Sequence, residues 1–169
     1  TSNFGGALAD GAGTSNLDVY SGVLTLSGGN TYTGTTLLSG GNLTLAGAGA
    51  LASTDVTITT GRTLTTQGGA ATGLAAATSL TNNGAFALTG DEEIGSIAGT
   101  GAVTLGTHTL TTGGLNSSTA LSGVVSGTGG LIKSGTGQLT LSGANTYVGQ
   151  TAVAAGTLDV TGSIASTSV

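Results

Sequence analysis

The chain repeats itself over a long distance, and this repeat limits the folds that it can adopt. Residues 22–47 and 137–162 align without gaps, are identical at 14 of 26 positions and are offset by 115 residues. The residues upstream also correspond if a two-residue indel is allowed, which gives copies near 6–47 and 123–162. Long internal repeats are typical of proteins in which each structural unit stacks on its neighbours. We therefore expect residues 1–169 to be a single segment of a larger repeat protein.

A shorter rhythm runs inside each long repeat. Pieces of four or five residues alternate apolar side chains with Thr, Ser or Asn and end at Gly, as in Leu24-Thr25-Leu26 and Leu139-Thr140-Leu141. Alternation with a period of two predicts β-strands, and no segment has the spacing of an amphipathic helix. Many short strands with glycine-rich corners predict an all-β fold, a right-handed single-stranded parallel β-helix or β-solenoid, with about seven to eight coils of roughly 20 to 25 residues. An antiparallel β-sandwich also fits the length but explains the repeat poorly.

The alternation also predicts which side chains fill the core. In each strand the apolar residues on one side of the alternation are expected to point inward, and the Thr between them outward. The residues expected to point inward are Leu24, Leu26, Leu43, Leu45, Val56, Ile58, Leu139, Leu141, Leu158 and Val160.

Composition excludes several classes of protein. The chain has no Cys and one His, so disulfide frameworks and Cys/His zinc sites are excluded. Two cationic residues against seven acidic ones give a net charge of -5, which excludes a basic surface for nucleic acid. No apolar run has the length of a membrane span, so we expect no membrane insertion by this segment.

The ionisable residues are too few and too scattered to predict an active site. We interpret Asp91-Glu92-Glu93 as a solvated corner, because the ligand spacing of a calcium loop is absent. His108 is interpreted as a surface residue, since no Gly-x-Ser-x-Gly motif accompanies it. Lys133 and Arg62 are interpreted as isolated surface cations that aid solubility or pair with an acid. We therefore predict no catalytic, cofactor-binding or metal-binding residues, no cofactor, and no enzymatic activity.

The motif Asn-Thr-Tyr-x-Gly occurs once in each long repeat. Its tyrosines could stack on a sugar, but residues tied to the repeat frame are better explained as structural. We predict that each Tyr fills a corner of the solenoid while the Asn hydrogen-bonds the backbone there. The predicted repeat-frame residues are Asn30, Tyr32, Gly34, Asn145, Tyr147 and Gly149.

Residues 127–160 resemble the passenger-associated repeat of bacterial autotransporters. The family pattern is met by Leu131, Lys133, Gly135, Gly137, Leu139 to Gly143, Asn145 to Tyr147, Gly149, Thr151, Val153 and Gly156 to Leu158. The first copy keeps Leu24 to Gly28, Asn30 to Tyr32 and Gly34, but has Asp18 in place of the lysine. The resemblance implies an extracellular parallel β-helix on the surface of a Gram-negative bacterium, attached to the outer membrane by a C-terminal barrel or released. It implies no single activity, because members of the family carry adhesins, enzymes and spacers on similar stalks.

These observations favour a structural function. We expect an extracellular passenger stalk or fibre segment that serves adhesion or biofilm formation. One alternative is a self-assembling β-helical filament, because uncapped coils expose unpaired strand edges. Another is an ice- or glycan-binding solenoid, because triplets such as Thr57-Ile58-Thr59 and Thr63-Leu64-Thr65 place pairs of Thr on one strand face. The expected partners are neighbouring coils of the parent chain or end-to-end copies of this one, with a host surface or a glycan as a further candidate.

Overall fold

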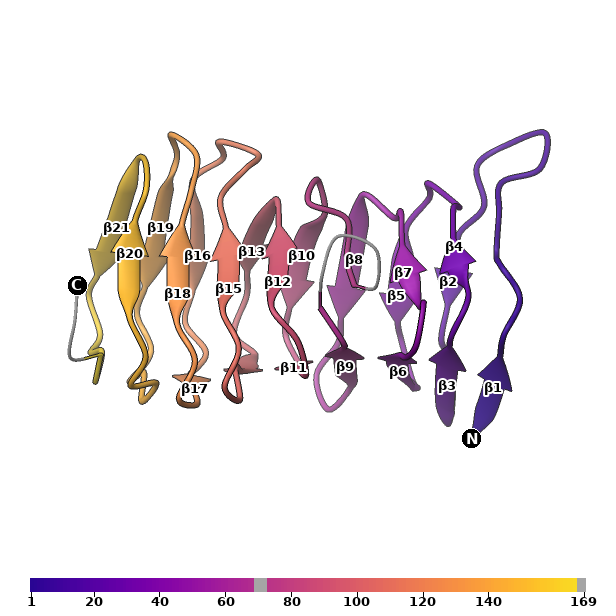
Figure 1. Cartoon of the computed structure of the whole chain (residues 1–169), viewed down its shortest axis with the longest axis horizontal. Helices are drawn as coiled ribbons and strands as arrows, with labels where there is room; N and C mark the ends of the chain where they lie inside the picture. The colour runs from indigo at the N-terminus through magenta and orange to yellow at the C-terminus, as the bar shows by residue number, and fades with distance from the viewer. Residues whose placement is uncertain (69–72, 167–169) are drawn as a thin grey trace.

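The chain winds as a β-solenoid of about eight turns (Figure 1). The computed structural model describes residues 1–68 and 73–166, and within these residues every regular element is a strand and every strand pairing is parallel. The predicted all-β parallel solenoid is therefore confirmed, and the antiparallel sandwich was wrong. In the described part of the chain no helix is long and apolar enough to cross a membrane.

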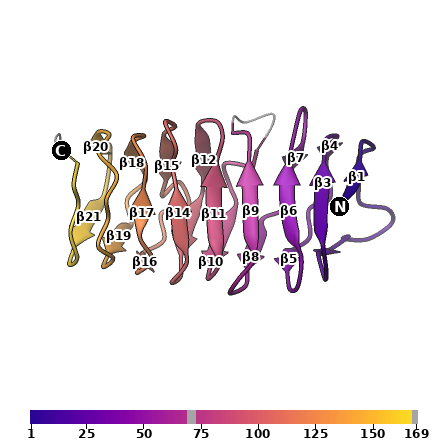
Figure 2. The same ribbon diagram turned by 90° about the horizontal axis from the view of Figure 1, so that it is seen from below.

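The strands form three faces that run along the axis of the solenoid. One face is a seven-stranded sheet, seen from the front in Figure 2. Its strands are β1 (Ser2–Phe4), β3 (Val23–Leu26), β6 (Asn42–Leu45), β9 (Thr63–Thr66), β11 (Ala85–Leu88), β14 (Ala102–Thr104) and β17 (Val125–Ser126).

The second face begins as a five-stranded sheet and continues past a parallel bridge between Gly99 and Leu121. Its strands are β2 (Leu17–Asp18), β5 (Thr36–Leu38), β8 (Asp55–Ile58), β10 (Ser79–Asn82), β13 (Ser96–Ala98), β16 (Thr119–Leu121), β19 (Gln138–Leu141) and β21 (Thr157–Val160).

The third face is more broken, and a bridge between Leu51 and Leu74 extends its first part toward its second. Its strands are β4 (Gly29–Asn30), β7 (Ala50–Leu51), β12 (Glu92–Ile94), β15 (Leu110–Thr112), β18 (Leu131–Lys133) and β20 (Thr151–Val153).

The core is a stack of inward side chains in register from coil to coil. On the first face Leu43, Leu64 and Phe86 are paired neighbours, and all three are fully buried. Seven of the ten predicted core residues are buried, whereas Leu24, Leu158 and Val160 are only partly covered. These three lie in coils near the ends of the stack, where fewer neighbouring side chains cover them.

Glycine at the corners lets successive coils approach closely. A Cβ atom at Gly123 would lie 1.8 Å from the carbonyl oxygen of Gly101, and one at Gly101 would lie 2.3 Å from that of Gly84. Neither distance is compatible with a side chain. The same relation continues to Gly143 and Gly162, so one glycine per coil forms a ladder along this corner.

The long sequence repeat is out of phase with the three faces. Strand β3 of the first copy lies on the first face, whereas the equivalent strand β19 of the second copy lies on the second face (Figures 1 and 2). Following the faces along the chain from β3 to β19 gives five full turns and two further faces. Equivalent residues of the two copies therefore point in different directions around the axis.

Candidate functional site

Asn145 ties three coils together from inside the solenoid. Its Nδ2 donates to the carbonyls of Gly143 and Ser163, each at 2.9 Å, and its Oδ1 accepts the backbone N–H of Val125 at 2.9 Å. Val125 belongs to the preceding coil and Ser163 to the following one. The side chain is 2% exposed, so water does not compete for these bonds.

Asn30 makes the same three bonds in the first copy. Its Nδ2 donates to Gly28 O at 2.8 Å and Ala50 O at 2.9 Å, and its Oδ1 accepts Leu8 N–H at 2.9 Å. Asn30 lies on the third face, whereas Asn145 continues the first face beyond β17. The arrangement is therefore independent of which face carries it.

Tyr32 and Tyr147 fill the interior beside these asparagines. Both are almost fully buried, and their hydroxyls hydrogen-bond Thr36 Oγ1 at 2.6 Å and Thr151 Oγ1 at 2.7 Å. Burial raises the pKa of Tyr32 to about 12 and that of Tyr147 above its usual value, against the lowering effect of these hydrogen bonds. Neither ring is available to stack on a ligand.

Gly34 and Gly149 complete the motif at a corner where the coils touch. A Cβ atom at Gly34 would lie 2.1 Å from Ser15 O, and one at Gly149 would lie 2.2 Å from Gly129 O. The asparagines and glycines predicted from the repeat frame therefore lie against the chain's own backbone in both copies, and the tyrosines bond buried threonine hydroxyls. Their contribution to stability remains a prediction.

The acidic cluster is only in part the solvated corner that the sequence predicted. Asp91 and Glu93 are exposed, but Glu92 is 2% exposed because it begins strand β12 on the inward side of the alternation. Its Oε1 accepts Leu74 N–H at 2.8 Å, whereas its Oε2 has no hydrogen-bond partner in the described part of the chain. Burial raises the pKa of Glu92 to about 7, against smaller lowering effects of the Thr66 hydroxyl and the Leu74 N–H.

Lys133 is also inside the solenoid, so its interpretation as a surface cation was wrong. The side chain is 1% exposed, and Nζ donates to the carbonyls of Ser134, Gly135 (2.9 Å) and Ala155 (3.4 Å). Burial lowers the pKa of its ammonium group. Among the described residues, backbone carbonyls and no carboxylate accept hydrogen bonds from this charged group.

The first copy places Val19, and not Asp18, where the second copy has Lys133. Leu17 pairs with Thr36 as Leu131 pairs with Thr151, which sets the equivalence between strands β2 and β18. Two residues further on, Val19 is buried, whereas Asp18 is exposed and accepts a hydrogen bond from the Ser39 hydroxyl. The expectation of Asp18 at this place was wrong by one residue, because it used the ungapped offset across the indel.

The remaining ionisable groups do not form a catalytic arrangement in the described residues. His108 Nδ1 lies 3.8 Å from Asp91 Oδ1, and Asp91 Oδ1 also accepts Thr109 N–H at 2.8 Å. Arg62 Nη1 donates to Gly40 O at 2.8 Å. Residues 1–68 and 73–166 contain no group of three His, Cys, Asp or Glu that could hold a metal ion.

The threonine triplets do not build a continuous ladder. On the first face the outward residues Thr25, Thr44 and Thr65 are paired neighbours, but Ala87 follows before Thr104. A surface of repeated hydroxyls therefore extends over three strands.

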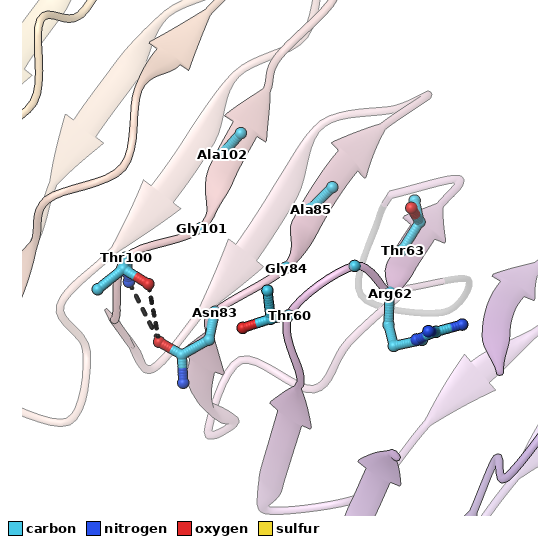
Figure 3. A pocket seen from close by; sticks show the side chains of 10 residues that line it. Thr60, Arg62, Thr63, Asn83, Gly84, Ala85, Thr100, Gly101 and Ala102 are labelled. Atoms are coloured by element: carbon cyan, nitrogen blue, oxygen red, sulfur yellow. Dashed lines mark hydrogen bonds between the residues drawn. The ribbon is translucent and has the colours of Figure 1, made fainter. Parts of the chain in front are cut away.

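A groove of about 470 Å³ crosses strands β9, β11 and β14 near the glycine corner (Figure 3). Thr63, Ala85 and Ala102 are cross-strand neighbours that form its floor, while Thr60, Asn83 and Thr100 come from the adjoining corners. Gly61, Gly84 and Gly101 also line it. This groove could not be predicted from the sequence, because its shape depends on which corners stack.

Comparisons with known proteins find similarity in both copies of the long repeat. Residues 20–46 and 131–160 match the passenger-associated-transport-repeat family. The adhesin BmaC autotransporter of Brucella suis biovar 1 (strain 1330) is 43% identical over 74 residues, which are 44% of this chain. The chain spans 2% of the length of that curated relative. No solved structure matches the chain significantly. The predicted resemblance to passenger-associated repeats is confirmed.

Proposed function

We propose that this chain, which carries two passenger-associated-transport repeats, is a structural segment of an autotransporter passenger on the surface of a Gram-negative bacterium or released from it. The observation that carries the proposal is the match of both repeats, whose Asn30 and Asn145 each join three coils of a solenoid. A role in adhesion is supported by the similarity to an autotransporter named as an adhesin.

The solenoid would act as a rigid spacer. Within residues 1–68 and 73–166 the strands of each coil pair only with those of its neighbours, so folding can propagate from one coil to the next after the chain has left the cell. The chain has no Cys, so this process needs no disulfide formation. Fibre segments of this kind hold a more distal part of the passenger away from the membrane.

The proposed role is not enzymatic. The buried ionisable groups Glu92 and Lys133 hydrogen-bond the chain's own backbone, and His108 lies at a corner beside Asp91. A structural requirement explains all three without a substrate.

Antibodies raised against the isolated polypeptide test the proposed location. We expect them to label intact cells of the source bacterium, and we expect external protease to remove the signal while a periplasmic control protein survives. Labelling only after the cells are permeabilised would refute surface display.

End-to-end assembly is a second candidate, supported by the terminal strands. Within the described residues β1 pairs only with β3, and β21 pairs only with β19, so each leaves one edge unpaired. A further coil of the parent chain or a second copy could pair there. Electron microscopy of the purified polypeptide tests this candidate, since growing fibres would support it and uniform short rods would exclude it.

A further inference from the structure

We propose that the groove across β9, β11 and β14 is a binding site for a linear, uncharged glycan that lies along the axis of the solenoid. This inference deepens the proposed adhesive role.

The groove repeats the same two features in three successive coils. Each coil supplies one small floor residue in register, namely Thr63, Ala85 or Ala102. A polar side chain precedes it in each coil: Asn83 and Thr100 lie two residues before the floor residue, and Thr60 lies three residues before it. Successive strands are about 4.8 Å apart, a distance comparable to the length of one sugar unit. A polymer of repeating polar units laid across the strands would therefore meet an equivalent floor position at regular intervals, with polar corner side chains beside it.

The corner residues keep hydrogen-bonding groups free for a ligand. Asn83 Oδ1 accepts the N–H of Thr100 at 3.2 Å and its hydroxyl at 3.3 Å, which fixes the amide plane (Figure 3). Among the described residues, Asn83 Nδ2 and the hydroxyls of Thr60 and Thr63 have no partner. Donors and acceptors of this kind match the hydroxyl groups of sugars.

Charge favours an uncharged glycan. The groove is lined by no acidic residue, and its one cation, Arg62, turns its guanidinium away from Asn83 and Thr100 to bond Gly40 O at 2.8 Å (Figure 3). The net charge of -5 repels a polyanion at long range. The space of about 470 Å³ is open and not enclosed, which suits an extended polymer that lies on the surface.

Calorimetric titration of the full polypeptide with cellohexaose, chitohexaose and xylohexaose tests the proposal, with a sulfated oligosaccharide of similar length as the charged comparison. We expect at least one neutral oligosaccharide to bind and the sulfated one to bind more weakly. Thr60→Val removes one hydroxyl without changing shape, and Asn83→Asp removes the free donor while keeping the acceptor for Thr100. Each is expected to weaken binding about fivefold.

Two arginine substitutions on strand β14 distinguish binding in the groove from binding elsewhere on the first face. Ala102 and Thr104 are both exposed and lie two residues apart on β14, but only Ala102 lines the groove. Ala102→Arg should abolish binding, and Thr104→Arg should leave it unchanged. Binding of none of the neutral oligosaccharides, stronger binding of the sulfated one, or equal binding by both arginine variants would overturn the proposal. Because the titration uses purified protein, its failure would leave the proposed surface location intact.

Discussion

Replacing Asn145 by Ala should destabilise the solenoid more than any exposed substitution. The change removes two hydrogen bonds donated at 2.9 Å and leaves the buried N–H of Val125 without its acceptor. Each lost bond costs about 1 kcal/mol, and a buried unpaired N–H costs about 1 to 3 kcal/mol. The expected loss in the free energy of unfolding is therefore about 4 kcal/mol, a large fraction of the stability of an ordinary domain.

Denaturation by guanidinium chloride, followed by circular dichroism, measures this loss. Asn16→Ala is the matched control, because Asn16 Oδ1 also accepts a backbone N–H, from Thr35 at 2.8 Å, but at an exposed position where water can replace it. We expect the control to cost less than about 1 kcal/mol. Hydrogen exchange at Val125 should accelerate in Asn145→Ala alone. Equal losses in the two variants would refute the reasoning that burial makes this asparagine essential.

Three further predictions concern the interior and the corners. The pKa of Glu92 is raised from 4.5 to about 7 in the folded state, so the free energy of unfolding should fall by up to about 3 kcal/mol as pH rises from about 4.5 to 7. Glu92→Gln should flatten this part of the plot of unfolding free energy against pH. Gly123→Ala should cost more than about 2 kcal/mol in thermal unfolding because its Cβ would overlap a backbone carbonyl, whereas Gly11→Ala, with open space around it, should cost little. Lys133→Met leaves three carbonyls without their charged donor and should lower the free energy of unfolding, measured by chemical denaturation, by about 1 to 3 kcal/mol. An increase in stability would show that the cost of burying the ammonium group exceeds the stabilisation from its hydrogen bonds.

The strand core could be predicted from the sequence because its signal is local. In Leu43-Thr44-Leu45 the alternation places two side chains inward, and the structure buries both. Parallel stacking followed from the repeat together with glycine at the corners. The extent to which Leu24 and Leu158 are buried could not be predicted, because it depends on how completely the coils near each end of the stack surround these side chains.

Charged residues inside the solenoid could not be predicted from residue type. Glu92 and Lys133 occupy inward positions of β12 and β18, where alternation alone would have placed them in the core. General expectations put charges outside, because an unpaired buried charge is costly. Solenoid corners change this balance, since their backbone groups lie close to the buried side chains. Three carbonyls accept hydrogen bonds from Lys133, and one N–H reaches Glu92, whose raised pKa favours its neutral form. The contradiction between alternation and residue type was the signal that could have identified both.

The two copies of the long repeat place equivalent residues on different faces of the solenoid. This difference helps to distinguish residues that serve folding from residues that could serve binding. Asn30 and Asn145 make the same three bonds although they lie on different faces of the solenoid. A surface that binds a ligand requires its residues to face one direction, and equivalent residues of these two copies do not. The Asn-Thr-Tyr-x-Gly motif is therefore suited to hold coils together at any face. The groove near Asn83 depends on consecutive coils of one face and lies outside both matched segments, so a binding role is better sought there.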